Sequence, residues 1–386
     1  MSLLMNKKIC VVSGTRAEWY LLKNLCKEIK NDKDLTLQLI VSASHLSHDF
    51  GLTYKEIEKE FKIDKKINIL LSSNDSIGIC KSMGLLQISL CEAFEELKPD
   101  IVVILGDRYE MLVVASTCLM MQIPLAHLCG GELTLGAMDD SIRHAITKMS
   151  HLHFVSTELY AKRVIQLGEN PKRVFNVGSI GGEIIQNMQF LNKEELQNQL
   201  NLKFNENMYL ITYHPQTLNL KSTQEEIEIL LNFLDQLDNA TLIFTKANAD
   251  ENGLMINEIL KKYCDENKNK TALFDNLGSL KYLSLMKIAK AVIGNSSSGI
   301  CESPFFKTPC INIGDRQKGR IFAKNVISVG INDLDKAWKI FNSKSYKDEL
   351  KTMVNPFASE NSSYKIKTIL KEQNLKSLLF KEFVDL

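Results

Sequence analysis

Residues 127–144, HLCGGELTLGAMDDSIRH, bring side chains suited to acid/base or metal chemistry into one short stretch. They include two histidines, one cysteine, three carboxylates and one arginine. His127 and Cys129 would share one face of a strand, but no second pair of ligands at zinc-like spacing follows them. We therefore expect no metal at this stretch and favour acid/base chemistry.

The carboxylates of this stretch follow small residues at the expected end of a strand. Gly130 and Gly131 let the backbone pass close to a ligand and present Glu132. Asp139 and Asp140 begin a helix, which they could equally well cap. Several carboxylates near an arginine and a histidine are what the removal and return of a proton require.

Polar residues also follow other apolar runs. Asp107 comes after IVVIL and a glycine, where a ligand contact and an N-cap role are equally plausible. Arg16, in SGTRAE, could hold a phosphate bidentately, although an arginine solvated on an ordinary turn is the simpler interpretation. His214 precedes a proline, and a lone histidine of this kind is more often structural than catalytic.

Two later stretches could hold an anion. GNSSSGICE, residues 294–302, offers hydroxyls and free N–H groups at the start of a helix, with Glu302 expected two turns in, where it could accept from ribose hydroxyls. Serines that only cap the helix are the alternative. In IGDRQKGR, residues 313–320, Arg316 and Arg320 could neutralise phosphate, but an exposed basic loop would look the same.

The elements that must position these residues are short apolar runs that alternate with amphipathic segments. The runs are nearly continuous in their hydrophobicity, which predicts parallel strands buried on both faces. The βαβα order predicts doubly wound α/β domains. The predicted strands are 9–12, 35–41, 101–105, 151–155, 174–177, 208–213, 241–245, 291–294 and 310–313.

A length of 386 residues suits two domains. The alternation loosens over residues 180–207, which are polar and rich in asparagine, so we place the boundary there. We expect a first domain over 1–180, a second over 181–361 and a helical tail over 362–386. Two doubly wound domains would bind a ligand in the cleft between them, at the carboxyl ends of their strands.

Composition narrows the function further. A net charge of +1 favours neither nucleic acid nor an anionic membrane as a partner. The nine cysteines form no Cys-x-x-Cys pair, which is typical of reduced core residues in a cytoplasmic protein. The uncharged stretch 111–129 contains Gln122, Pro124 and His127, so we expect a core helix, a turn and a buried strand there, and no membrane span.

Taken in order, the motifs SGTRAE, LGDRYE, HLCGGE with DDSIRHAITK, YHP, GNSSSG with its glutamate, and INIGDRQKGR closely resemble those of the hydrolysing UDP-N-acetylglucosamine 2-epimerases. The resemblance is greatest to the bacterial sialic-acid and legionaminic-acid branch. It implies the GT-B architecture: two Rossmann-like doubly wound parallel-sheet domains, an active site in the interdomain cleft, and a C-terminal helix that returns to the first domain. It also implies a homodimer or larger homo-oligomer and no metal or other cofactor.

The resemblance further implies a reaction on UDP-N-acetylglucosamine. UDP is eliminated as the C2 proton is lost, water adds to the 2-acetamidoglucal at C1, and C2 is reprotonated on its other face to give N-acetylmannosamine. Asp107, Asp139 and His214 match catalytic positions of the family. Positions that hold the nucleotide diphosphate, ribose or sugar are matched by Arg16, Arg108, Asn248, Ser296, Ser297, Glu302 and Arg316.

One position departs from the pattern. Many relatives carry a glutamate where this chain has Cys129, and a cysteine cannot serve as a carboxylate acid/base. Glu132, three residues later, is the expected substitute. Alternatives are the same chemistry on UDP-N,N'-diacetylbacillosamine or GDP-N-acetylglucosamine for legionaminic acid, a GT-B glycosyltransferase, and a sensor that binds a sugar nucleotide without catalysis.

Overall fold

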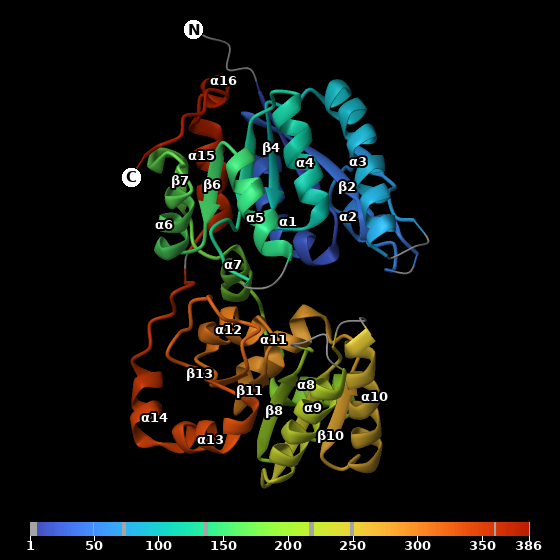
Figure 1. The fold of residues 1–386 in the computed structure, drawn as a ribbon, viewed down its shortest axis with the longest axis vertical. Helices are drawn as coiled ribbons and strands as arrows, with labels where there is room; N and C mark the ends of the chain where they lie inside the picture. The colour runs from blue at the N-terminus through green and yellow to red at the C-terminus, as the bar shows by residue number, and fades with distance from the viewer. Residues whose placement is uncertain are drawn as a thin grey trace. The chain divides into compact units, whose positions relative to one another are not determined.

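The computed structural model describes residues 6–48, 50–71, 75–134, 138–215, 220–247, 251–358 and 360–385. The chain forms two compact units, each built on one parallel sheet (Figure 1). One unit comprises Met1–Ile184 with Ser359–Leu386, and the other comprises Ile185–Ala358. The chain therefore consists of two parallel-sheet α/β domains, as the apolar runs predict.

The first unit carries a seven-stranded sheet in the order β3-β2-β1-β4-β5-β6-β7. The chain order reverses between β1 and β4, the kind of switch point beside which doubly wound proteins bind ligands. In sequence order β1 to β7 are Lys7–Ser13, Leu35–Ser42, Lys65–Ile67, Ile101–Leu105, Leu125–Leu128, Leu152–Val155 and Val174–Asn176. The helices are α1 Arg16–Asn31, α2 Tyr54–Glu58, α3 Ser76–Leu97, α4 Tyr109–Met120, α5 Met138–Met149, α6 Glu158–Gln166, α7 Ile180–Gln186, α15 Ser362–Glu372 and α16 Leu375–Leu378.

The second unit carries a six-stranded sheet in the order β10-β9-β8-β11-β12-β13. In sequence order β8 to β13 are Asn207–Thr212, Ala240–Thr245, Thr271–Phe274, Ala291–Gly294, Cys310–Ile313 and Val326–Val329. The helices are α8 Lys193–Leu200, α9 Leu220–Asp235, α10 Glu251–Glu266, α11 Gly278–Ile288, α12 Ser298–Cys301, α13 Leu334–Asn342 and α14 Lys344–Lys351. This sheet also reverses its order at its centre, between β8 and β11.

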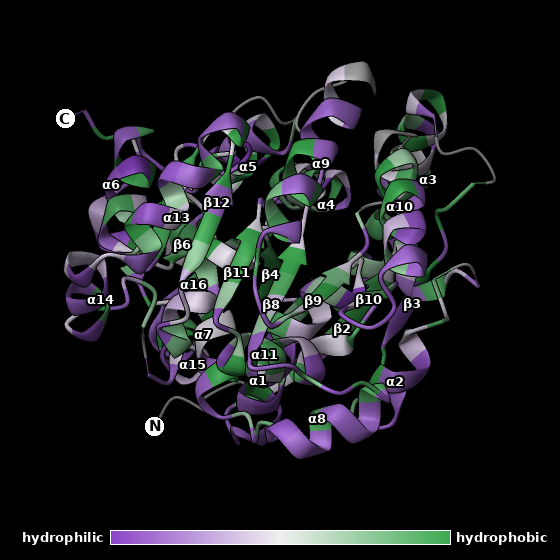
Figure 2. Ribbon diagram, turned by 90° about the horizontal axis from the view of Figure 1, so that it is seen from below, coloured by the Kyte–Doolittle hydropathy of each residue, from purple (hydrophilic) through white to green (hydrophobic). Residues whose placement is uncertain are grey.

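Alternate residues of the central strands face different cores, which explains their continuous hydrophobicity. In β1, Ile9 and Val11 join the core that also contains residues of α1 and α15, whereas Cys10 and Val12 join the core with α3 and α4. Figure 2 shows most of the central strands coloured as hydrophobic and much of the surrounding helical surface as hydrophilic. Each sheet is therefore a rigid layer whose strand ends can position polar residues.

The segment 111–129 has the predicted order of helix, turn and strand, formed by α4, a turn and β5. The edge strands β3, β10 and β13 were not predicted, because they are only partly buried and their apolar residues are mixed with polar ones such as Lys66, Thr271 and Ser328. Among the described helices, α3 is apolar and long enough to cross a membrane by length and composition alone. It packs against α4, and the core contains its residues Leu86, Leu90 and Phe94.

The C-terminal segment belongs to the first unit, where the red α15 lies beside α1 (Figure 1). Ile366 and Leu370 are fully buried in the core that α1 shares. Lys367 and Lys371 form ion pairs with Asp32 at 3.2 and 2.8 Å. The Lys371 bond leads the interactions that hold the pKa of Asp32 at about 2.

Candidate functional site

A buried arginine organises the strand ends of the first unit. Gly106, at a φ of 85°, turns the chain directly after β4 and is followed by Asp107. Arg143, on α5, donates from Nε to Oδ2 of Asp107 at 2.9 Å, and its Nη2 contacts the same oxygen. The Arg143 side chain is only 3% exposed, so water reaches this ion pair mainly from the side of the carboxylate, which is 27% exposed.

The same guanidinium reaches three further residues. Nη1 donates to the carbonyl oxygen of Glu132 at 2.8 Å and to Oδ1 of Asp140 at 3.2 Å, and Nη2 donates to the hydroxyl of Thr134 at 2.9 Å. Arginine suits this arrangement because its donors form a rigid planar fork. Arg143 thus brings together the turn after β4, the turn after β5 and the first turn of α5.

Asp139 lies in that first turn of α5, next to Asp140. Burial raises the pKa of Asp139, and the nearby negative charge of Asp107 raises it further. Arg143 and Arg108 act in the opposite direction without reversing the shift. Asp107 paired with arginine and Asp139 with a raised pKa are two carboxylates in unlike environments, which suits groups that accept and donate protons in one reaction.

The turn after β5 is fixed by backbone geometry and by His127. Cys129 has a φ of 68°, uncommon for a residue with a side chain, and Gly131 has a φ of 80°. A Cβ on Gly131 would lie 2.3 Å from the carbonyl oxygen of Tyr160, so only glycine fits there. His127 bonds through Nε2 to the Gly106 carbonyl at 2.8 Å and through Nδ1 to the Thr147 hydroxyl at 3.3 Å. Its role is to join two strand ends, and burial lowers its pKa to about 3.

A second charged cluster surrounds the start of α1. Arg108 donates to both carboxylate oxygens of Glu110, at 3.1 and 2.9 Å. Glu18 accepts from the backbone N–H groups of Gly14 and Thr15 at 2.7 and 3.2 Å. Burial raises the pKa of Glu18 to about 7, and the charge of Glu110 adds to the shift. Arg16, by contrast, is exposed at the first position of α1.

Sequence reasoning noted Arg143 only as an arginine near the carboxylates of residues 127–144, and it did not single out Glu18. The spacing of Arg143 from Asp139 and Asp140, four and three residues along one helix, placed all three on one face. Thr15 and Glu18 form a capping box, whose Thr-x-x-Glu pattern was readable as the start of α1. Neither pattern reveals that these side chains meet residues from another strand end.

In the second unit the strand ends meet at Asn295. Its side chain accepts from the N–H of His214 and donates to the carbonyl of His214, both at 2.7 Å, which ties the end of β8 to the end of β11. The Asn295 carbonyl accepts from Arg316 at 3.2 Å and from Gln317 at 2.8 Å. His214 and Arg316 therefore lie around one fully buried asparagine, whose role the motif GNSSSG did not reveal.

The serine-rich turn differs from its prediction in one respect. Helix α12 has only four residues, so Glu302 lies at its C-terminal end and not two turns in. Pro304 explains the early end, because it lacks the N–H that would continue the α-helical hydrogen bonds, and a short 3₁₀ turn, Ser303–Phe306, follows instead. Ser296 bonds to Ser298 at 3.1 Å, and burial raises the pKa of Glu302 to about 7. Asn248 lies outside the described residues.

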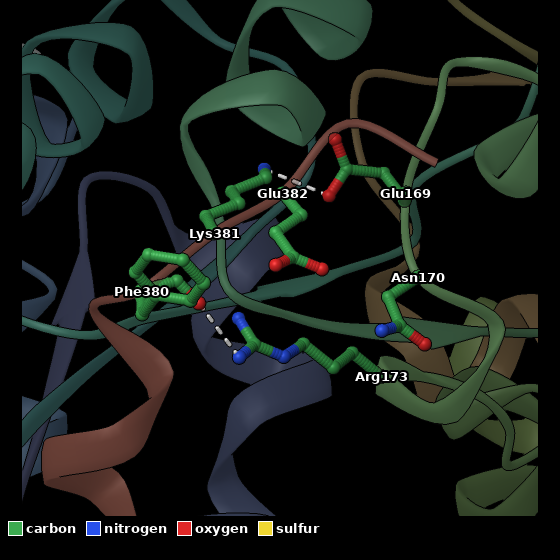
Figure 3. A pocket seen from close by; sticks show the side chains of 6 residues that line it. All are labelled: Glu169, Asn170, Arg173, Phe380, Lys381 and Glu382. Carbon is green, nitrogen blue, oxygen red and sulfur yellow. Dashed lines mark hydrogen bonds and ion pairs between the residues drawn. The ribbon is translucent and has the colours of Figure 1, made fainter. Parts of the chain in front are cut away.

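A further polar cluster holds the C-terminal tail and lines a small cavity of about 90 Å³ (Figure 3). Glu169 accepts from Lys148 at 2.6 Å, Lys381 at 2.7 Å and His153 at 2.9 Å. Arg173 donates to the carbonyls of Leu378 and Phe380, both at 2.9 Å. Glu169 and Arg173 precede β7, so this cluster lies at the amino end of that strand. Asp107 follows the carboxyl end of β4, so the two clusters lie at opposite ends of the parallel strands. Its role is to anchor the tail.

The described residues contain no group of three or more His, Cys, Asp or Glu side chains placed to hold a metal ion. The nine cysteines are free thiols. Most of the charged groups at the strand ends of the first unit are carboxylates and arginines, which can transfer protons and hold anions without a bound cofactor.

Comparison with known proteins identifies the family. The family model described as UDP-N-acetylglucosamine 2-epimerase matches residues 27–371. A Campylobacter jejuni protein, GDP/UDP-N,N'-diacetylbacillosamine 2-epimerase (hydrolyzing), is 66% identical over 381 residues, or 98% of this chain and 99% of the relative. Polysialic acid biosynthesis protein P7 of Escherichia coli is 36% identical over 388 residues, or 98% of each chain.

A solved structure supports the fold. The Methanocaldococcus jannaschii UDP-GlcNAc 2-epimerase, crystallised in complex with UDP-GlcNAc and UDP, superposes with a TM-score of 0.75 at 20% identity and covers 95% of this chain and 100% of its own. The two-domain α/β fold predicted from the motifs is thereby confirmed. From the family model and the 66% identity, the chain belongs to the hydrolysing UDP-N-acetylglucosamine 2-epimerase family and is an enzyme.

Proposed function

We propose that the substrate is a nucleotide-linked N,N'-diacetylbacillosamine, which the enzyme converts into the free C2 epimer and a nucleoside diphosphate. The proposal is supported by the substrate in the name of the Campylobacter relative, which is 66% identical over almost the whole chain. UDP-N-acetylglucosamine is the second candidate substrate, supported by the family description and by the ligand of the Methanocaldococcus structure.

The observation that carries the chemistry is the convergence on Arg143. One carboxylate removes the proton from C2 while the C1–O bond to the diphosphate breaks, which leaves a glycal and the nucleoside diphosphate. Water then adds at C1, and a second acid protonates C2 from the opposite face. Asp107, held by Arg143, is suited to the first role, and Asp139, whose pKa is raised, is suited to donating a proton.

Glu132 and His214 complete the proposed catalytic set. The choice of Glu132 is supported by Arg143, which bonds both to the Asp107 carboxylate and to the backbone carbonyl of Glu132. His214 lies at the end of β8 with its backbone fixed by Asn295. We assign nucleotide or sugar binding to the residues that match the family motifs: Arg16, Arg108, Asn248, Ser296, Ser297, Glu302 and Arg316.

The fate of the C2 hydrogen tests the reaction. In D₂O the released sugar is expected to carry deuterium at C2, because the proton returned there comes from solvent. A product without deuterium would contradict elimination. Activity is expected to persist in EDTA, and a loss that added divalent metal restores would contradict the carboxylate mechanism.

A substrate panel tests the specificity. Purified enzyme is incubated without an acceptor with UDP- and GDP-linked N,N'-diacetylbacillosamine and with UDP- and GDP-linked N-acetylglucosamine, and the released nucleotide is measured. The highest kcat/KM is expected for a diacetylbacillosamine nucleotide. Preference for a GlcNAc nucleotide would contradict this choice of substrate, and a strict need for an acceptor would favour a glycosyltransferase.

The proposed setting is the cytoplasm, where nucleotide sugars are made and where the nine free thiols would stay reduced. We also propose a homodimer or larger homo-oligomer that acts in sialic-acid or legionaminic-acid synthesis. Light scattering of the purified protein measures the assembly, and a monomeric mass at working concentration would contradict it.

A further inference from the structure

A cavity of about 350 Å³ lies in the first unit, at the carboxyl ends of β1 to β4. It is lined by Thr15, Ser44 and Arg108, which follow shortly after the ends of β1, β2 and β4, respectively. The rest of the wall is largely apolar and includes Phe50, Leu70, Leu71 and Ile79. It thus combines apolar side chains with a few polar groups, the usual composition of a small-molecule site.

The apolar wall is open to solvent. Phe50 is 60% exposed, and Leu70 and Leu71 are each 39% exposed, although all three line the cavity. Large apolar side chains gathered in this way are costly to leave in water and mark surfaces that bury a ligand. A ligand with methyl groups would cover them.

The cavity adjoins the carboxylates already described. Arg108 lines the cavity and directly follows Asp107, the carboxylate bonded to Arg143. Glu110, also on the wall, holds the Arg108 guanidinium through two hydrogen bonds. Because β1 lies between β2 and β4 and β4 pairs with β5, the cavity and the Arg143 network occupy neighbouring parts of one sheet edge. The adjacent residues Asp107 and Arg108 link the two.

We propose that this cavity binds the C4 acetamido and C6 methyl groups of the sugar while its C2 lies at Asp107 and Asp139. C4 to C6 lie on the edge of a pyranose ring opposite to C1 and C2, so they point away from the reacting bonds. The inference rests on the proposed substrate, a 2,4-diacetamido-2,4,6-trideoxyhexose, and assigns the residues that recognise it.

Each substituent has a chemical match. The C6 methyl group and the acetyl methyl group can pack on Phe50, Leu70 and Leu71, whereas the C6 hydroxyl of a GlcNAc nucleotide would lose its water against the same wall. The Ser44 hydroxyl donates to the Gly14 carbonyl at 2.9 Å, so its oxygen remains an acceptor for the N–H of the C4 acetamido group.

The test compares kcat/KM for three UDP sugars: diacetylbacillosamine, N-acetylglucosamine, and 2-acetamido-2,6-dideoxyglucose, which has the C6 methyl but a C4 hydroxyl. In Leu70→Asn and Phe50→Ser the preference for diacetylbacillosamine over N-acetylglucosamine is expected to fall about 10- to 100-fold, the range that apolar contacts supply. Ser44→Ala should lower kcat/KM for diacetylbacillosamine while leaving the ratio of the other two sugars unchanged.

Leu159→Asn is the matched control, since Leu159 is 42% exposed on α6 and does not line the cavity. It should retain the wild-type preference, and Leu70→Met should recover most of it. If Leu70→Asn and Phe50→Ser melt like wild type and keep the preference, the cavity assignment is wrong although the substrate stands. If the wild-type enzyme prefers UDP-N-acetylglucosamine, the proposed substrate fails and this assignment fails with it.

Discussion

Arg143 and Asp107 are 36 positions apart in the sequence, yet Nε of the arginine donates to Oδ2 of the aspartate at 2.9 Å. Arg143 is almost fully buried, whereas the Asp107 side chain is 27% exposed. The buried cation thus holds a carboxylate whose other side is open to solvent. This arrangement fixes the orientation of Asp107 and leaves it accessible to a substrate.

Replacing Arg143 should separate positioning from charge. Arg143→Lys keeps a positive charge but loses the planar fork that contacts Asp107, Glu132, Thr134 and Asp140. We expect kcat to fall about 10²- to 10³-fold, because misplacing a catalytic group by about 1 Å can cost 10²-fold. KM should change much less. Lys162→Gln, on the exposed side of α6, is the control and should keep wild-type kcat.

The purified Arg143→Lys and Lys162→Gln proteins are compared with wild type by initial rates and by thermal melting. If Arg143→Lys turns over like wild type, the network is not a catalytic scaffold. If its melting transition disappears, Arg143→Gln with added guanidinium as a chemical rescue distinguishes a positioning role of Arg143 from a purely structural one. Only a positioning role predicts recovery of kcat in a folded protein.

The raised pKa of Asp139 predicts opposite effects on stability and activity. A carboxyl whose folded pKa exceeds its unfolded pKa stabilises the protein below the unfolded value, and that contribution is lost as pH rises through the folded pKa. Ionised Asp139 therefore opposes folding at neutral pH, where Asp139→Asn should melt at the same temperature or higher. The substitution removes a proton-transferring group, so kcat should fall about 10²- to 10⁴-fold.

The pH profile checks the same assignment. In wild type, kcat/KM should depend on a group with an apparent pKa above the ordinary aspartate value of 3.8, and this dependence should vanish in Asp139→Asn. Asp265→Asn, an exposed aspartate of the second unit, is the control for melting and should change neither property. A clearly lower melting temperature of Asp139→Asn at neutral pH would contradict the predicted direction of the stability change.

The sequence was sufficient to predict the strands that carry the sites. The strands around the sheet centres, such as β1, β4, β8 and β11, are continuous apolar runs because both faces are buried, and that pattern is local. The polar residues just after these strands could be identified for the same reason, because the end of each apolar run marks the end of the strand. The edge strands β3 and β13 were not predicted, because they are only partly buried and polar residues interrupt their apolar pattern.

The side-chain networks could not be predicted from local sequence patterns. Nothing near Arg143 in the sequence shows that it bonds to Asp107 on another strand end, and nothing near Asn295 shows that it fixes His214. The predicted position of Glu302 was wrong because Pro304, which lacks an N–H, ends α12 after a single turn. Contacts that link distant segments depend on sheet order, which the alternation of elements leaves open.

The ion cluster around Glu169 predicts acid-sensitive anchoring of the C-terminal tail. Burial alone would raise the pKa of Glu169, but the hydrogen bonds from its positively charged and histidine partners outweigh burial and lower it to about 2. A carboxyl with a lowered folded pKa stabilises the protein above its unfolded pKa, and the contribution is lost as pH falls through the folded value. The stabilisation is therefore expected at neutral pH and should decline from about pH 4.5 to about pH 2.

Glu169→Gln tests this at two pH values. At pH 7 it should lower the free energy of unfolding by an amount between the about 1 kcal/mol of an exposed ion pair and the about 3–5 kcal/mol of a broken buried one. The difference from wild type should shrink below pH 4.5. Glu96→Gln, which removes an exposed partner of Lys65, should have little effect at either pH. A penalty that persists unchanged in acid would show that Glu169 acts through packing.

The last prediction concerns the turn after β5, where Cys129 stands in place of the glutamate found in many relatives. Cys129 packs against the core of the first unit and has a backbone φ of 68°, whereas Glu132 follows two glycines and its carbonyl is held by Arg143. If Glu132 supplies the proton transfer that the cysteine cannot, Glu132→Gln should lower kcat by about 10²- to 10⁴-fold with UDP affinity nearly unchanged. Cys129→Ser should keep most of the activity, because it preserves the size and the backbone of a packing residue.

Calorimetry with UDP measures the affinity of each variant, and initial rates with the preferred sugar nucleotide measure its kcat. Wild-type turnover in Glu132→Gln, or inactivity confined to Cys129→Ser, would reverse the two roles while leaving the 2-epimerase assignment intact.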